Sequence, residues 1–406
     1  MKNLPALRAL LVLASCGALL PGCSLFNDGP KWGSKRAAKE AAVVPALPEP
    51  IPTHRFVIDA STDIVGVVQK TQATKEDTLT DIARRFNVGY EEIVRANPGV
   101  DPWLPGEGRE IVIPSQFILP NAPREGIVIN AAAMRLFYYP KVKKGEPQVV
   151  HTYPIGIGKV GWKTPEGATK IVRRQKDPTW RPTPSIIKEH LEERGEKLDK
   201  VIGPGPDNPL GRFAFYLGWP SYMIHGTNKP AGVGLRSSHG CIRLYPEDIA
   251  VLFEMAPIGT PVRVVNQPFV FGFKDGALHI QAFDVLEDDP RDWKKAQAKL
   301  LNKALAESIQ KELAKRKEKI DWEAVAQLSS DPRGIPVSVS GGPDKLENIV
   351  AGATLVQNKV APGATWDGVS DLPVDEATFQ ELVSDREPTV EAAAAAATPA
   401  TKPVTN

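Results

Sequence analysis

The stretches His225-Gly-Thr-Asn-Lys-Pro230 and Ser237-Ser-His-Gly-Cys-Ile-Arg243 indicate both the fold and the chemistry of this 406-residue chain. The first follows a strand-like run, and the second is a turn that carries the thiol of Cys241. A thiol is a useful nucleophile only as its thiolate, so it needs an imidazole, amide dipoles or a cation nearby. A histidine that ends one strand can reach a cysteine on the next turn. We therefore expect Cys241 to be a nucleophile with His225 as its base.

The neighbouring residues complete a candidate site. Glycine at position 240 allows backbone N–H groups to approach a developing oxyanion closely. His239 either lines the pocket or makes a structural hydrogen bond, and Arg243 either binds a substrate carboxylate or anchors its loop. A zinc site built from His225, His239 and Cys241 would need paired ligand spacing, such as CxxC or HExxH, which the sequence lacks. We therefore expect no metal.

These two stretches resemble the L,D-transpeptidase catalytic domain of the YkuD type, whose signature is HGT followed by S-x-G-C-x-R. Further matches are Pro154–Gly158, Trp162–Gly167, Asp177–Trp180, Gly205–Gly211 and Gly232–Gly234. The resemblance implies a β-sandwich-like catalytic domain without a cofactor. It also implies that a backbone carbonyl orients His225. The substrate-binding residues that it implies are Gly226, Thr227, Ser238, His239, Gly240 and Arg243.

The resemblance implies a two-step acyl transfer on peptidoglycan. Cys241 would attack the third residue of a tetrapeptide stem and expel D-Ala. An amine of a second stem or of a wall-anchored lipoprotein would then take the acyl group. Two alternatives stay open from the residues themselves. Transfer to water would make the protein an L,D-carboxypeptidase or a cysteine amidase, and a wall-binding lipoprotein would use its glycan module without any catalysis.

That glycan module lies upstream, where the sequence favours strand, helix, helix, strand. Asp77-Thr-Leu79, Ile82-Ala83, Ala96-Asn97 and Ile111–Pro114 resemble a LysM domain. The resemblance implies binding to the N-acetylglucosamine-containing glycan strands of peptidoglycan. Because Glu76 stands where the family usually has glycine, weak glycan binding or a mere spacer role stays open.

The N-terminus reads as an export signal, with a positively charged start followed by an apolar run. Leu20-Pro-Gly-Cys23 resembles the bacterial lipoprotein cleavage box, which implies a lipid on Cys23, with Cys16 as the alternative. The protein would then be periplasmic and attached to a membrane through this lipid. Ser24 favours the outer membrane over the inner one. The mature chain would keep a single thiol, Cys241, and no disulfide.

Composition supports this organisation. The 50 Lys and Arg residues nearly balance the 48 Asp and Glu residues, which argues against nucleic-acid binding through bulk charge. The 38 prolines and 33 glycines favour a mainly β fold. With what the resemblances imply, the expected architecture is a β-sandwich-like catalytic domain preceded by a small βααβ domain and followed by a helix and a disordered tail. The expected segments are a signal peptide (1–22), a linker (23–63), the LysM domain (64–115), the catalytic domain (126–266), its hairpin extension (267–284), a basic amphipathic helix (290–328) and the tail (329–406).

Overall fold

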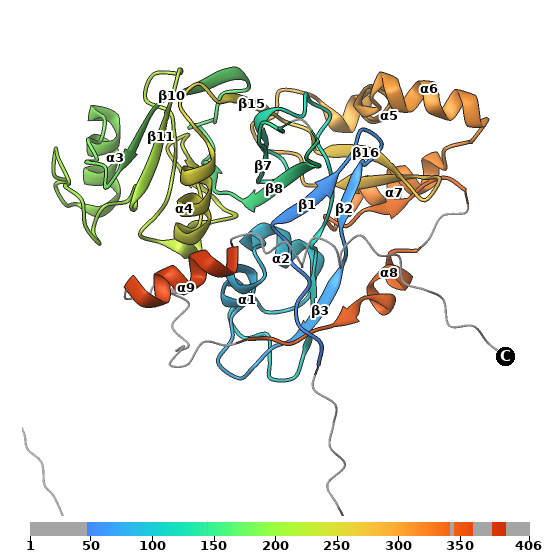
Figure 1. Cartoon of the computed structure of the whole chain (residues 1–406), viewed down its shortest axis with the longest axis horizontal. Coiled ribbons are helices and arrows are strands. Elements are labelled where there is room, and N and C mark those ends of the chain that lie inside the picture. The colour runs from blue at the N-terminus through green and yellow to red at the C-terminus, as the bar shows by residue number, and fades with distance from the viewer. Residues whose placement is uncertain (1–46, 144, 342–344, 360–375, 387–406) are drawn as a thin grey trace, which may run out of the picture. The chain divides into compact units, whose positions relative to one another are not determined.

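The computed structural model describes residues 47–143, 145–341, 345–359 and 376–386. The expected export signal, Cys16 and Cys23 lie outside these residues, as do three parts of the expected tail, 342–344, 360–375 and 387–406. The described chain is mainly β, as the sequence predicts, and Figure 1 shows its strands and helices in chain order. No helix within the described ranges has both the length and the apolar character needed to cross a bilayer.

A nine-stranded sheet forms the catalytic domain. Strand β10 connects the two halves of this sheet. The first residues of β10 pair with β15 and its last residues pair with β11. The register of β10 against β11 shifts between Ile171 and Arg173. Apolar side chains from both halves share one core with helix α4 (Pro246–Met255), so the sheet folds around that core in a sandwich-like way. The strand order is β1 (Arg55–Ile58), β8 (Gln148–Pro154), β7 (Arg135–Tyr139), β6 (Gly126–Asn130), β15 (Pro261–Val265), β10 (Gly167–Lys176), β11 (Phe213–Leu217), β12 (Met223–His225) and β14 (Ile242–Arg243).

The first half of this sheet is buried on both faces. Alternate residues of a strand point to opposite faces. On β7, Leu136 and Tyr138 therefore face the main core, while Phe137 and Tyr139 pack on the other side against β1. This explains why β1, which lies inside the expected linker, is an ordered strand paired with β8.

The LysM domain has the predicted βααβ order, with β3 (Gln69–Gln72), α1 (Leu79–Arg85), α2 (Tyr90–Ala96) and β4 (Glu110–Ile113). Thr78 caps α1 through a capping box with Asp81, which satisfies two backbone donors at the helix start. The first LysM strand begins at Gln69 rather than at the expected Ile64. Strand β2 (Ile64–Gly66) instead pairs with β5 (Gln116–Ile118).

The expected helix over 290–328 is three helices: α5 (Trp293–Ala304), α6 (Glu307–Arg316) and α7 (Trp322–Ser330). The single-helix prediction was wrong because the backbone is extended at Leu305 and left-handed at Lys317, where φ is 55°. Their apolar faces pack on a hairpin of β16 (Phe269–Lys274) and β17 (Ala277–Ala282), which β18 (Val337–Ser338) extends. The hairpin thus has its own core with these helices.

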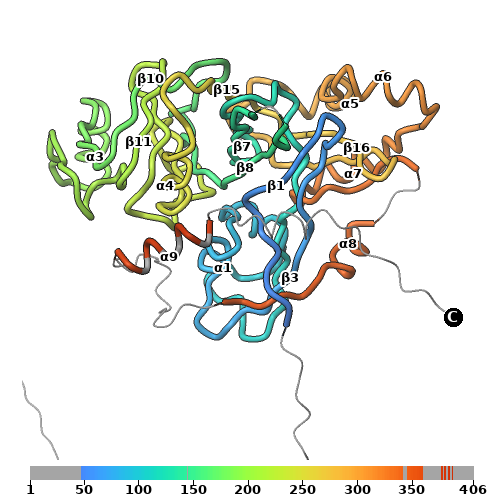
Figure 2. The backbone as a smooth tube through the Cα atoms, in the orientation of Figure 1, coloured from blue at the N-terminus to red at the C-terminus, as the bar shows by residue number. Residues whose placement is uncertain are grey.

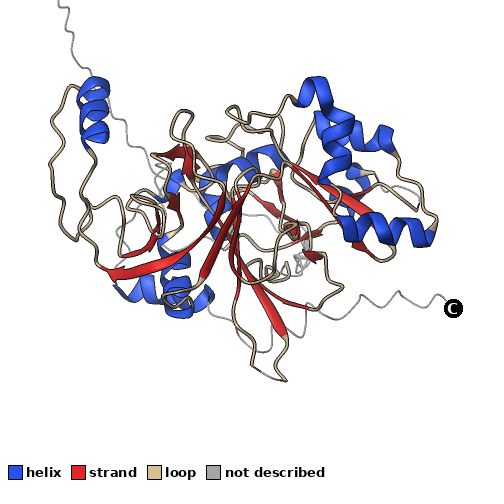
Figure 3. Cartoon of the chain, turned by 90° about the horizontal axis from the view of Figure 1, so that it is seen from above, coloured by secondary structure: helices blue, strands red, loops and turns tan. Residues whose placement is uncertain are grey.

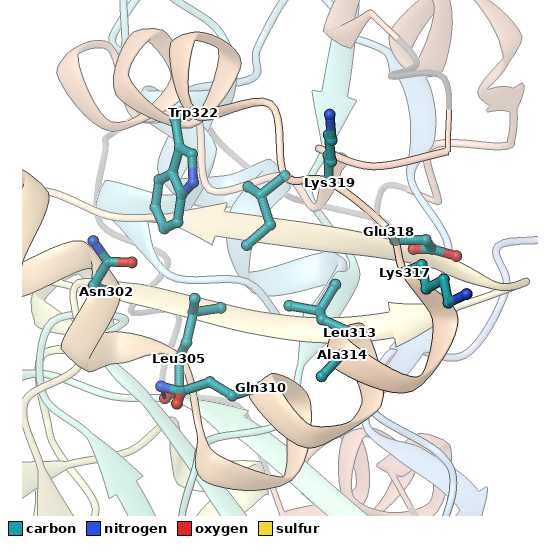
Figure 4. A pocket seen from close by; sticks show the side chains of 10 residues that line it. Asn302, Leu305, Gln310, Leu313, Ala314, Lys317, Glu318, Lys319 and Trp322 are labelled. Carbon is teal, nitrogen blue, oxygen red and sulfur yellow. Dashed lines mark hydrogen bonds between the residues drawn. The ribbon is translucent and has the colours of Figure 1, made fainter.

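A groove of about 760 Å³ lies between these helices (Figure 4). Leu305 and Leu313 form its apolar floor, Trp322 forms one wall, and Lys317 and Lys319 lie on its rim. None of the candidate catalytic residues lines it.

Part of the expected disordered tail is ordered. Helix α8 (Leu346–Gly352) leads to β19 (Thr354–Leu355), which pairs in parallel with β3 of the LysM domain, so that two segments far apart in the sequence lie side by side in Figure 2. Val356 is fully buried in the LysM core. Helix α9 (Glu376–Arg386) packs beside α4. Composition could not reveal these contacts, because a two-residue strand is held by backbone pairing.

The remaining elements surround the candidate site. Strands β9 (Ile157–Gly158) and β13 (Arg236–Ser238) form a small parallel pair, and a 3₁₀ turn spans Pro230–Gly232. Helix α3 (Pro184–Arg194), which the sequence analysis did not predict, has no buried residue. It stands apart from the strands at the left of Figure 3.

Candidate active site

Two neighbouring strands place the predicted nucleophile and base on the same face of the sheet. Strands β12 and β14 are parallel, with Ile224 opposite Ile242 and His225 opposite Arg243. The two isoleucines are fully buried in the core. By alternation, His225, Arg243 and the preceding Cys241 all lie on the opposite face of these strands.

His225 is held in one tautomer. Its Nδ1 lies 2.6 Å from the carbonyl oxygen of Gly226. Because a carbonyl only accepts, Nδ1 carries the proton and Nε2 keeps its lone pair. Burial, together with the nearby Arg243 guanidinium, lowers the pKa of His225 from 6.5 to about 3. The imidazole is therefore a neutral base with Nε2 available.

The thiol of Cys241 is also neutral. Burial raises its pKa to about 11, against smaller opposing effects of a backbone hydrogen bond and of Arg243. Its Sγ donates to the carbonyl of Ser221, 3.6 Å away. No hydrogen bond joins Cys241 to His225 among the described residues. The structure thus shows the thiol in a resting orientation, with its proton on a backbone acceptor.

The turn that presents this acceptor is strained. Tyr222 N donates to Trp219 O, and the turn between them contains Pro220 and Ser221. The φ angle of Ser221 is 68°, a left-handed value that costs a non-glycine residue roughly 1 kcal/mol or more. The strained residue is thus the one whose carbonyl accepts the Cys241 thiol.

The backbone around Cys241 is fixed by a serine and a glycine. Ser238 Oγ donates to the Cys241 carbonyl at 2.6 Å and accepts from Gly240 N at 3.2 Å. At Gly240 φ is 98°, and a Cβ there would lie 2.8 Å from the ring of Tyr222. Glycine is thus required at this position. The N–H of Cys241 itself has no hydrogen-bond partner in the described part of the chain.

Two predicted substrate-binding residues make contacts that shape their own loop. Thr227 is 4% exposed, and its hydroxyl accepts from Lys229 N at 2.9 Å. Gly226 packs against Ile249, where a Cβ would lie 3.0 Å from the side chain. These contacts shape the loop after His225. They leave the threonine hydroxyl engaged in a turn.

His239 and Arg243 have polar partners next to the nucleophile. His239 Nε2 lies 2.9 Å from Glu189 of α3, and its ring packs edge-on against Trp162 at 4.8 Å between centroids. Glu189 also pairs with Lys159, whose hydrogen bond lowers the pKa of that carboxyl. Arg243 donates to Ser237 Oγ at 3.2 Å, while its buried Nε has no partner in the described structure.

Sequence reasoning did not identify Ser221, Lys159 and Glu189 as site residues, and it noted Trp162 only as part of a stretch that matches the family. Ser221 acts through its carbonyl, which every residue type has. Lys159 and Glu189 belong to elements with no motif of their own. Among the described residues, no group of three or more His, Cys, Asp or Glu side chains is arranged to hold a metal ion.

Both domains of the chain resemble known protein families. A profile of the L,D-transpeptidase catalytic domain matches residues 124–264, and a LysM profile matches residues 73–114. The chain is 42% identical over 246 residues to "Probable L,D-transpeptidase YbiS" of Escherichia coli strain K12, covering 59% of this chain and 76% of that protein. The chain belongs to the L,D-transpeptidase family. The resemblance seen in the sequence is thereby confirmed.

Other members of the L,D-transpeptidase family support this assignment. "Probable L,D-transpeptidase ErfK/SrfK" of the same organism is 43% identical over 210 residues, which cover 51% of this chain and 66% of the relative. "Probable L,D-transpeptidase YcfS" is 40% identical over 262 residues, covering 62% and 80%. The solved catalytic domain of the E. faecium L,D-transpeptidase acylated by ertapenem is 23% identical, covers 36% of this chain and 99% of that one, and has a TM-score of 0.26. That score is too low to support a structural argument.

Proposed function

We propose that this protein is a peptidoglycan L,D-transpeptidase in which Cys241 is the nucleophile and His225 the general base. The observation that carries the proposal is the arrangement of the two strands. They bring His225 and Cys241 to the same face, and the Gly226 carbonyl leaves Nε2 of the imidazole as the free base. Membership of the L,D-transpeptidase family supports the reaction class.

In the first step the thiol turns from Ser221 toward the imidazole. His225 Nε2 takes the thiol proton while Sγ attacks the carbonyl carbon of the third residue of a tetrapeptide stem, typically diaminopimelate. The bond to the terminal D-Ala breaks, and the imidazolium returns the proton to the leaving amine. The product is a thioester on Cys241 and free D-Ala.

In the second step an acceptor amine attacks the thioester carbon. The amine loses a proton to His225, the C–S bond breaks, and the thiolate of Cys241 recovers the proton. A second stem as acceptor gives a 3–3 crosslink, and a lysine of a wall-anchored lipoprotein gives covalent attachment of that protein. Water as acceptor gives the tripeptide of an L,D-carboxypeptidase.

The surrounding groups fit the charges of these steps. The N–H of Cys241, which has no partner among the described residues, is suited to the oxyanion of the tetrahedral intermediate. The buried Nε of Arg243 is a donor without a partner in the described structure, suited to a substrate oxygen. Gly240, Ser238 and His239 form the rest of the pocket.

The LysM domain would bind the glycan strands that carry the stems. Trp103, in the loop after α2, is 53% exposed and offers an aromatic surface for a sugar ring. Export to the periplasm and a lipid on Cys23 would keep the enzyme at the membrane, with the outer membrane favoured by Ser24. Both residues lie outside the described part of the chain.

The test is incubation of the protein with purified disaccharide-tetrapeptide stems, followed by mass spectrometry. New 3–3 dimers support the transpeptidase. Tripeptides alone would support the L,D-carboxypeptidase, and unchanged tetrapeptides would contradict both enzymes and support a wall-binding protein. The turnover rate of the Cys241→Ala variant should fall by at least about 10³-fold, because the nucleophile is missing. The variant should still sediment with sacculi. Turnover by this variant would refute the assignment of the nucleophile.

A further inference from the structure

The LysM domain contacts the part of the catalytic domain that precedes Cys241 in the sequence, at Val233 and Gly234. At the start of α2, Tyr90 N donates to Val233 O at 3.3 Å and Glu91 N donates to Gly234 O at 3.2 Å. A Cβ on Gly234 would lie 2.1 Å from Tyr90 N, and one on Gly89 would lie 2.9 Å from the Cα of Gly234. The two backbones therefore touch without a side chain between them.

The LysM domain also contacts the part of the catalytic domain that follows Cys241, at Tyr245 and Glu247. The hydroxyl of Tyr245, a residue only 1% exposed, donates to Val88 O at 3.2 Å. Next to it, Arg84 of α1 makes two hydrogen bonds to the buried Glu247, at 3.0 and 3.1 Å. The stretch from Gly234 to Tyr245, which includes Cys241, is thus held at both ends by the LysM domain.

These contacts lead to the reacting groups through the backbone. Gly234 N donates to Ile155 O at 3.2 Å, and the next residue along, Gly156, exchanges two hydrogen bonds with Arg243 at 2.8 and 3.0 Å. Arg243 follows Cys241 by two residues on the same face. A shift of the chain at Gly234 would therefore be passed to the strand that positions the thiol.

We propose that the LysM domain braces the catalytic segment, fixing both ends of the stretch from Gly234 to Tyr245 so that Cys241 is held in register with His225. This role goes beyond glycan binding, because it needs no ligand in the LysM domain. It rests on the proposed nucleophile. Catalysis depends steeply on geometry, since a displacement of about 1 Å can cost about 100-fold in rate. The brace should therefore set the reactivity of the thiol even toward a small soluble reagent.

The main test is Gly89→Ala in the full-length protein. The φ angle of Gly89 is −86°, so alanine suits the backbone, and its Cβ pushes on Gly234 from the LysM side. We expect the maximal rate of Cys241 acylation by ertapenem, followed by intact mass and counted per titratable thiol, to fall about tenfold, with sacculus binding unchanged. The matched control is Gly203→Ala, whose Cβ would meet no heavy atom within 4 Å. It should react like wild type.

Tyr245→Phe is a milder second variant that keeps the ring and loses only the bond to Val88. We expect the maximal rate of acylation to fall about threefold. We also expect a changed pH profile, because a displaced His225 no longer assists the reaction over the same pH range. A normal rate per thiol and a normal pH profile in both variants would overturn the brace, even if less protein folds. Failure of the wild-type protein to react with ertapenem would instead refute the nucleophile itself, and the brace with it.

Discussion

At the scale of single residues, burial keeps the reacting pair uncharged. The pKa of His225 is lowered to about 3 and that of Cys241 is raised to about 11. Between these values the thiol keeps its proton and the imidazole stays neutral. Both groups are thus uncharged at rest near neutral pH, so in the proposed reaction the thiol loses its proton to Nε2 during the attack. Ser221, which holds the thiol at rest, has to release it first.

This charge state predicts two different pH dependences. Alkylation by iodoacetamide needs the thiolate, whose fraction below its pKa rises tenfold per pH unit, so the alkylation rate of Cys241 should rise about tenfold per unit between pH 7 and 10. Acylation by ertapenem uses neutral His225 and should stay level between pH 5 and 8. Both rates are measured by intact mass. Rapid alkylation that is flat from pH 5 upward would show an ion pair instead.

The control for this prediction is His225→Gln. It should lose the level ertapenem reaction while its alkylation stays steep, because only the first reaction uses the imidazole. A variant that kept the level ertapenem reaction would show that another group is the base.

The sequence predicted the residues whose chemistry depends on the side chain. Cys241 and His225 stand out because few other residue types could do their work. A backbone carbonyl was expected from the family resemblance to orient His225, and in the structure it is the carbonyl of Gly226, next to His225 Nδ1. The acceptor for the thiol, Ser221 O, could not be predicted, since a backbone carbonyl leaves no signature in the residue type. Thr227 was expected at the substrate, and in the structure its hydroxyl accepts from Lys229 N in a turn.

At the scale of elements, α3 differs from the other helices of the catalytic region. It has no buried side chain, so its attachment depends on polar contacts. Glu189 reaches across to Lys159 and to His239, and Glu193 reaches Lys159 at 3.5 Å. Surface pairs of this kind contribute about 0–1 kcal/mol each. With no fully buried apolar side chain to support it, the helix depends largely on these few contacts for its position over the catalytic turn.

Removing the central carboxylate should therefore free the helix. Glu189→Gln is expected to increase tryptic cleavage within residues 184–194 by about threefold, and 1 M NaCl should do the same to wild type by screening. The matched control is Glu192→Gln. Glu192 pairs with Lys188 at 3.7 Å, and because both residues belong to α3, this pair does not connect the helix to the rest of the protein. Equal cleavage of the two variants would show that Glu189 does not hold α3.

Periodicity explains which elements were predicted. Strands β7 and β8 carry runs of apolar residues, and α4 carries an apolar face, so their patterns indicate these elements. Helix α3 lacks such a face and was missed, although Thr183, Pro184 and Gly195 are usual signals of a helix start and end. The apolar stripe from α5 to α7 was seen, but the breaks at Leu305 and Lys317 are conformational and carry no proline or glycine.

At the scale of the whole described molecule, the LysM domain is bound to its neighbours from several sides. Strand β19 extends its sheet, and Thr71 Oγ1 donates to Val356 O at 3.0 Å. Asn358 donates to Asp77 and accepts from Arg85. These contacts join the domain to the segment that follows α8.

The strongest link between the LysM domain and the catalytic sheet is a buried ion pair. Arg135 of β7 donates to both carboxylate oxygens of Glu92 on α2, each at 2.7 Å, and the two side chains are 1% and 6% exposed. Arg135 also donates to Asn87 O and stacks on the ring of Phe117 at 4.0 Å. Breaking one partner of such a pair leaves the other charge buried without compensation, which costs about 3–5 kcal/mol.

We therefore expect Glu92→Gln to lower the free energy of unfolding by about 3 kcal/mol, since the amide still accepts from Gly89 N but no longer neutralises Arg135. Scanning calorimetry of the wild-type protein should show the LysM and catalytic domains unfolding in one transition, because their contacts are buried and polar. In Glu92→Gln the LysM domain should separate as an earlier transition. Glu192→Gln, which breaks the exposed Lys188–Glu192 pair, is again the control. It should change the free energy of unfolding by less than about 0.5 kcal/mol. If the wild-type protein already showed two unfolding transitions, the interface would be too weak to couple the two domains. A LysM domain that is not coupled to the catalytic domain could not position the thiol of Cys241.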